Sequence, residues 1–316
     1  MLSVVTSMTK PAGEAFATTS RALVMECHRS AVRARLAKAG HVRPGPHSVS
    51  WKINREIIVV AGWGRAILLQ LAHPSVSAGV AGHSSFRGCP ISGFRRLRST
   101  VGAMLALTFG DSEEMITAAA GINVIHDRVR GIDATGAVYS AHDPALLQWV
   151  HATLVESIPL TYERFVGPLT PRDRDRYCTE AAIMEPLLGI PAGRLPRDAA
   201  SLDLYLREML DSGRLVVTDA SRTLARAILF PRRWQFAWPV FRFMQLVTIG
   251  SLPPSIRDAY GFEWRPRDAR ALARWTMSIR MLLKVLPPFV REWPVSRGMH
   301  DERFVARSGP CGQVTG

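Results

Sequence analysis

Apolar residues recur at spacings of three and four along most of the chain, which is the period of an amphipathic helix. The clearest case starts at Asp111, where Glu114 completes the pattern of a capping box. The helix that follows should end at Gly131, and its apolar stripe consists of Met115, Ala118, Ile122, Ile125 and Val129. The alternation of apolar and polar residues that is typical of β-strands does not recur along the chain. Only residues 215–218 could form a short extended stretch. The pattern therefore predicts an all-α fold.

Start and stop signals divide the rest of the chain into further helices. Asp143-Pro144 and Thr170-Pro171 each combine an N-cap residue with a proline in the first turn. The expected helices are 20–39, 51–71, 94–109, 111–131, one from 144, one from 171 closed by Gly189, 198–212, one from 220, one from 234, and 266–286.

The apolar segment from Trp51 to Leu71 is interrupted by charged residues, so we expect one buried helix there rather than a membrane span. His73-Pro74 should end it, because proline disfavours the helical conformation of the residue before it. Gly79 and Gly82 then predict a turn region that continues to residue 88.

Proline and glycine at residues 44–46 mark a linker. The chain is accordingly expected to have three parts: an N-terminal basic tail and helix over 1–45, a large helical domain over 46–290, and a C-terminal tail over 291–316.

Basic residues outnumber acidic ones by 40 to 26, giving a net charge of +14. The arginines are spread along the chain rather than gathered with aromatic groove-reading elements, so we expect no nucleic-acid partner. The four cysteines lie far apart and form no C-x-x-C pair, which argues against a disulfide framework, a cysteine zinc site and covalent c-type haem. A reducing, cytoplasmic setting follows as the default.

Residues 234–252 form a second apolar segment, interrupted by Arg242 and Pro239. A spanning helix would place Arg242 near the middle of the bilayer at a cost of roughly 2.5–3.5 kcal/mol, so a core helix is favoured. Peripheral membrane contact through Trp234, Trp238 and nearby arginines is left open.

Two histidines project from apolar helical faces. His126 has Ile122 and Val129 as helical neighbours, and His151 has Leu147 and Leu154. A single histidine of this kind is usually a hydrogen-bonded core residue, but a neutral imidazole is also the commonest ligand for a metal or haem iron.

Arg96 and Thr100 are four residues apart and share one helix face. If Arg96 is buried, it needs a counter-charge such as a haem propionate or an iron-bound oxygen species; the alternative is a surface arginine beside Arg95 and Arg98. Several enzyme classes are excluded, because the chain lacks Glu-x-x-His pairs, a zincin helix, a Gly-x-Ser-x-Gly elbow and both phosphate-binding loop patterns.

Between about residues 50 and 265 the chain resembles the mpaB-type oxygenase family, which shares its catalytic domain with the rubber oxygenases (latex clearing proteins). The motifs that carry the resemblance, in order, are 62–74 (GWGRAILLQLAHP), 78–80 (AGV), 83–86 (HSSF), Arg96-x-x-x-Thr100, Phe109-Gly110, Ile125-His126-x-x-Val129-x-Gly131, Tyr139-x-Ala141-x-Asp143-Pro144, 149–154 (WVHATL), 188–191 (LGIP) and Leu252-Pro253-Pro254-x-x-Arg257-x-x-Tyr260-Gly261.

The resemblance implies a globin-like helical core with additional helices that binds haem b in the domain over 46–290. It places His126 as the iron ligand, Arg96 and Thr100 on or near the distal, catalytic side, and His151 and Arg96 among the residues that hold the cofactor. Relatives cleave carbon–carbon double bonds of isoprenoid chains with O2.

The chain departs from the rubber oxygenases at Ser99, where they can carry a lysine that occupies the distal iron position. No export signal is evident either, so polyisoprene is not the expected substrate. We interpret the sequence as a haem-dependent oxygenase that uses O2 on a small lipophilic, unsaturated, isoprenoid-like molecule. A haem- or lipid-binding protein without turnover is the alternative, and the cytoplasm, with or without membrane association, is the expected location.

Overall fold

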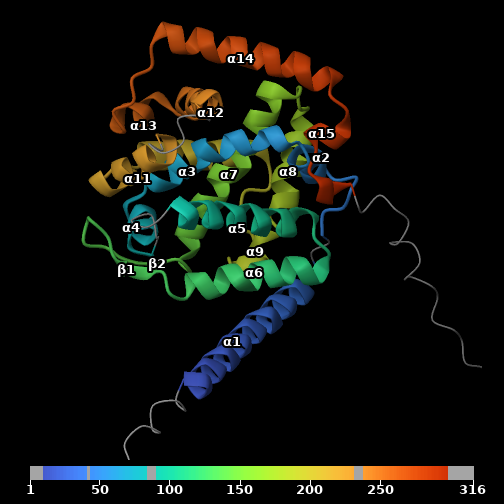
Figure 1. Cartoon of the computed structure of the whole chain (residues 1–316), viewed down its shortest axis with the longest axis vertical. Helices are drawn as coiled ribbons and strands as arrows, with labels where there is room; N and C mark the ends of the chain where they lie inside the picture. The colour runs from blue at the N-terminus through green and yellow to red at the C-terminus, as the bar shows by residue number, and fades with distance from the viewer. Residues whose placement is uncertain (1–9, 41–42, 84–89, 231–237, 298–316) are drawn as a thin grey trace, which may run out of the picture.

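The computed structural model describes residues 10–40, 43–83, 90–230 and 238–297 (Figure 1). The all-α prediction is confirmed, since helices make up most of this part of the chain and a single small hairpin is its only sheet. The elements are α1 (Lys10–Ala39), α2 (Val49–Asn54), η1 (Ile57–Gly62), α3 (Trp63–Leu71), α4 (Pro74–His83), α5 (Pro90–Phe109), α6 (Ser112–His126), β1 (Arg130–Ile132), β2 (Val138–Ser140), α7 (Pro144–Phe165), α8 (Pro171–Ala181), α9 (Met184–Leu188), α10 (Ala199–Asp211), α11 (Asp219–Leu229), α12 (Trp238–Ser251), α13 (Pro254–Ala259), α14 (Pro266–Val285), α15 (Pro288–Arg291) and η4 (Pro294–Ser296).

The centre of the molecule is the packing of η1 and α3 against α7, with α12 on another side of α3. Glycines allow this close approach. A Cβ at Gly62 would collide with Thr161 and the carbonyl of Ser157 on α7, and one at Gly64 would collide with Thr248 on α12. Bulkier residues at these two positions would therefore force the helices apart.

Arg65 joins the same three helices by hydrogen bonds and an ion pair. It is 7% exposed and forms a bidentate pair with Glu156 of α7, with 2.7 Å between Nη2 and Oε1. It also donates to the Ser157 hydroxyl at 2.8 Å and to the Ser251 carbonyl at the end of α12, again at 2.8 Å. Burial lowers the pKa of Arg65 to about 10, so the guanidinium stays charged at neutral pH.

A second layer is built from α5, α6, α1 and α9. Figure 1 shows α5 and α6 running side by side, with α1 crossing beneath α6 and projecting from the body at its N-terminal end. One apolar cluster connects the four helices; its buried members are Val32, Leu107, Met115, Ile116, Ala119, Ile183 and Leu187. At the opposite end of the long axis, α14 lies over α12.

The predicted helix over 51–71 is wrong in its continuity, because the structure divides it into α2, η1 and α3. The break falls at Arg55 and Glu56, whose backbones pair with the C-terminal segment: Trp293 donates to the Arg55 carbonyl at 2.9 Å, and Glu56 forms a bridge with Glu292. Tertiary hydrogen bonds from far along the chain thus override the local helical pattern.

The predicted turn region is also wrong where the structure describes it. Helix α4 runs through Gly79 and Gly82 to His83, and Gly79 packs closely on Val129 and Tyr139. This glycine serves a close approach to the β1–β2 hairpin rather than a turn. The rest of the predicted turn, around 84–88, lies outside the described residues.

Three further boundaries differ from the pattern. Helix α6 ends at His126, and Gly131 lies in β1 instead of ending a helix. The helix expected from 171 is split into α8 and α9 before it closes at Gly189, which has a φ of 73°. Residues 215–218 are irregular and belong to no strand, while α1 begins at Lys10, well before the expected residue 20.

Within the described ranges, no single helix is both long and apolar enough to cross a membrane. The pair Ile57–Leu71 and Pro74–Gly82 passes that test only when taken together, and it bends by 106° at the break.

Replacing Glu156 by Gln should lower the free energy of unfolding by about 2–4 kcal/mol, because the buried Arg65 would lose its counter-charge. Urea denaturation at pH 7 measures this loss. The matched control is Glu208→Gln on the exposed surface of α10, which should change stability by less than about 0.5 kcal/mol. Equal effects of the two substitutions would contradict the central role of the Arg65 pair.

Candidate functional site

The connection between α5 and α6 decides which of the candidate residues lie near one another. Only Gly110 and Asp111 separate the two helices, so they must run antiparallel as neighbours. At a rise of 1.5 Å per residue, Arg96 lies about 20 Å before the end of α5, and His126 lies about 21 Å after the start of α6. The backbone positions of Arg96 and His126 are therefore level with each other at the open end of the helical hairpin. Figure 1 shows α5 and α6 lying side by side.

The stripes of side chains by which α5 and α6 face each other are apolar at the closed end of the hairpin and become polar toward its open end. Nearer its closed end, Leu107 of α5 packs in one buried cluster with Met115 and Ile116 of α6, and Met104 packs against that cluster. Continuing the α5 stripe by four residues reaches Thr100, which is exposed. The apolar seal between the helices thus ends before Thr100.

On α6 the same stripe ends in His126, a half-buried side chain. Its Nδ1 is buried and has no hydrogen-bond partner. Burial lowers the pKa of His126 to about 4, with nearby His142 acting in the same direction and Asp127 opposing it. The imidazole is therefore neutral at neutral pH, which is the form that binds a metal.

A cluster that the sequence reasoning missed lies beside His126. Asp127 accepts hydrogen bonds from His28 of α1 at 2.7 Å and from His142, which follows β2, at 2.8 Å. The His142 ring meets the His126 ring edge to face at 5.7 Å between centroids. Asp127 could have been suspected from its position next to His126, but nothing local indicates that His28 folds back to it.

The β1–β2 hairpin borders the site and was also missed. Its turn is organised by Asp133, which accepts from the Thr135 backbone at 2.8 Å and from the Ala137 backbone at 3.1 Å, with Gly136 at a φ of 84°. Ser75 of α4 donates to the same carboxylate at 2.6 Å. The Asp-x-x-Gly spacing is the signal that could have predicted this turn.

Of the four predicted site residues, the structure brings three to the α5–α6 hairpin and places His151 elsewhere. Thr100 and His126 lie on facing stripes of one hairpin, and Arg96 occupies the α5 position one turn beyond Thr100; its side chain is outside the described part of the chain. His151 is buried in the N-terminal half of α7, and the charge that acts on it is that of Arg197. Its role beside the other three stays a prediction.

Burial lowers the pKa of His151 to about 4, with the charge of Arg197 acting in the same direction. His73, between α3 and α4, is a third imidazole whose pKa is lowered by burial, and its Nδ1 is buried without a partner. His73 is therefore a rival to His126 as a ligand, although it lies outside the α5–α6 stripe.

The described residues contain no group of three or more His, Cys, Asp or Glu side chains that could hold a metal ion by themselves.

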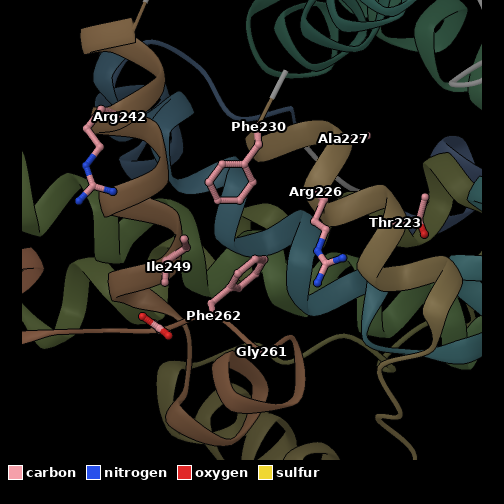
Figure 2. A pocket seen from close by; sticks show the side chains of 9 residues that line it. Thr223, Arg226, Ala227, Phe230, Arg242, Ile249, Gly261 and Phe262 are labelled. Carbon is pink, nitrogen blue, oxygen red and sulfur yellow. The ribbon is translucent and has the colours of Figure 1, made fainter. Parts of the chain in front are cut away.

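A cavity of about 870 Å³ lies elsewhere, between α11, α12 and the segment after α13. Figure 2 shows the rings of Phe230 and Phe262 near one another in this cavity, with Arg226 and Arg242 at its sides. Its described lining residues include no histidine or cysteine, so this part of the cavity offers no imidazole or thiolate to an iron. It is separate from the α5–α6 hairpin.

The fold and site define a helical protein with one neutral, unpartnered imidazole at the open end of a helical hairpin. Residues 51–281 match the family described as the catalytic domain of ER-bound oxygenase mpaB/B′ and rubber oxygenase. Because the match covers most of the chain, the protein belongs to this family of oxygenase catalytic domains. No curated protein and no solved structure matches the chain, so the globin-like arrangement stays a prediction.

Acid should destabilise the fold through its neutral histidines. In the unfolded chain these histidines take up protons near pH 6.5. In the folded protein His126 and His151 stay neutral down to a pH of about 4. Between these values the unfolded state binds more protons, so the free energy of unfolding falls as the pH falls. Urea titrations between pH 7 and 4.5 should show this slope, and His151→Gln should reduce it; an unchanged slope would contradict a neutral buried His151.

Proposed function

We propose that the protein is a haem b-dependent oxygenase that uses O2 on a small, lipophilic, unsaturated molecule. The observation that carries the proposal is His126: a neutral imidazole with a buried, unpartnered nitrogen, at the point where the apolar seal between α5 and α6 ends. Membership of an oxygenase family supports the reaction class.

The residues at the open end of the hairpin fit a porphyrin. Gly102 on α5 and Gly121 on α6 carry no side chain, and a Cβ at either would meet nothing within 4 Å. Ile122 and Ile125 add apolar surface next to His126, with Ile125 62% exposed. A flat apolar group could cover this surface while His126 binds its iron.

Bound haem would supply the O2 chemistry, which amino-acid side chains cannot provide. The protein's own residues would set access and charge. His126 would hold the iron on the α6 side, and the Thr100 hydroxyl, one turn before the seal, would donate a hydrogen bond on the α5 side. Arg96, one further turn away, would supply a positive charge for a propionate or for negative charge that develops during the reaction.

His151 has a separate part in this proposal. Its neutral ring lies among the residues that join α7 to the segment around Arg197. There it would help to hold the pocket by packing between elements, without contact with the reacting atoms.

Two features restrict the substrate. Ser99 replaces the lysine that rubber oxygenases can present to the iron, so this chain has no side chain at that position able to occupy the distal site. The apolar side chains of Ile122 and Ile125 next to His126 favour a lipophilic molecule over a charged one. A small isoprenoid-like compound suits these conditions better than a polymer.

The purified protein, supplied with haem, should show a Soret absorption band that shifts when it is reduced under carbon monoxide. His126→Ala should abolish haem retention, because it removes the iron ligand. His142→Ala is the matched control: it removes a neighbouring imidazole that is hydrogen-bonded to Asp127 and should leave the band intact. A band that survives in His126→Ala but disappears in His142→Ala or His73→Ala would refute the assignment.

Thr100→Val should keep the Soret band but lower O2 consumption with an unsaturated isoprenoid by about 10- to 100-fold, since one preorganised donor is lost. An oxygen electrode measures this rate, and Thr108→Val on the same helix serves as the control because its hydroxyl bonds to the Met104 carbonyl of its own helix. A haem-loaded wild type that consumes no O2 with any lipophilic substrate would instead favour a binding protein without turnover.

A further inference from the structure

Helix α14 has an outer face that the proposed reaction does not use. Figure 1 shows α14 along one end of the molecule, opposite α1, with α15 following it. Its inner face is accounted for, since Leu272, Ile279 and Leu283 pack in a cluster with α12. The opposite face carries no described part of the chain.

The C-terminal half of this outer face is apolar. Met277, Met281 and Val285 follow one another at four-residue spacing and are 60%, 64% and 78% exposed. Phe289, on the short helix α15 that continues the surface, is 66% exposed. Large exposed apolar side chains that gather in this way mark an interaction surface rather than an ordinary solvated one.

The N-terminal half of the same face is basic. Arg270 and Arg274 precede Met277 on the outward row, and Lys284 flanks Val285. Residues 269–291 contain five basic residues and no acidic one. Within the described part of the chain, Arg270, Arg274 and Lys284 form no ion pair, so their charges are available to a partner.

We infer that the α14–α15 surface binds the face of an anionic lipid bilayer, with Met277, Met281, Val285 and Phe289 entering the interfacial region. An apolar face with basic flanks is the chemistry that such a surface recognises. A second copy of the chain fits less well, because pairing two such faces would bring basic residues together without acidic partners. Nucleic acid fits less well too, since phosphates offer nothing to the exposed methionines and phenylalanine.

Sedimentation with vesicles tests this inference on the full-length protein. The wild type should sediment with phosphatidylcholine vesicles that contain 30% phosphatidylserine, and it should stay in the supernatant with phosphatidylcholine alone at physiological salt. Met281→Asp/Val285→Asp should weaken binding to the anionic vesicles at least tenfold, because the two carboxylates oppose both insertion and the surface potential. Both side chains are exposed, so circular dichroism and the thermal midpoint should not change.

The matched control is Leu204→Asp/Val216→Asp, which adds the same charge at two apolar residues that are 52% and 47% exposed elsewhere. It should bind nearly as well as the wild type. Arg270→Gln/Arg274→Gln should also weaken binding by about tenfold or more. The inference is overturned if the wild type ignores anionic vesicles, if the control loses as much binding as the α14 variant, or if the α14 variant instead converts a dimer into a monomer in ultracentrifugation.

Discussion

A charged residue in the middle of an apolar core constrains the whole architecture. Arg65 can be buried only where Glu156, Ser157 and the Ser251 carbonyl meet it together. These partners belong to α7 and to the end of α12, so the orientation of three helices is fixed by one guanidinium. The glycines at 62 and 64 allow the distances that this arrangement requires. Apolar packing alone would tolerate many relative rotations of these helices, whereas a bidentate ion pair tolerates few.

The α5–α6 hairpin depends on this frame without belonging to it. Its own cluster is formed with α1 and α9, and α9 reaches the main core through the buried packing around Leu188 and Met184. The hairpin therefore has a firm closed end and an unsealed open end. That difference in packing leaves Thr100 exposed and His126 only half-buried at the unsealed end.

Local signals in the sequence were enough to predict much of the helical framework. The capping box at Asp111 and Glu114 and the Asp143 cap are present as predicted, with Glu114 N to Asp111 Oδ1 at 2.8 Å. Such caps are read from neighbouring residues alone. The breaks at Arg55 and Glu56 could not be read in this way, because the groups that cause them are Glu292 and Trp293, far along the chain.

The candidate site likewise has features that could be predicted from local sequence and features that could not. The equal level of Arg96 and His126 follows from helix lengths and a two-residue connection, which the sequence contains. The partnership of Asp127 with His28 does not, since it requires α1 to fold back beneath α6. The position of His151 depends on how α9 and the segment around Arg197 pack against α7, and no local pattern encodes that packing.

The crossing of α1 beneath α6 has a consequence for where this catalytic domain begins. The family match starts at residue 51, yet Val32 of α1 is fully buried against α6 and α9, and Arg35 donates to the Pro186 carbonyl at 2.7 Å. A chain shortened to the matched residues would remove Val32 from the buried cluster that contains Met115, Ile116 and Ala119 of α6. Helix α1 lies outside the family match but contributes to the apolar cluster of α5, α6 and α9. The smallest unit able to fold is therefore longer than the matched residues.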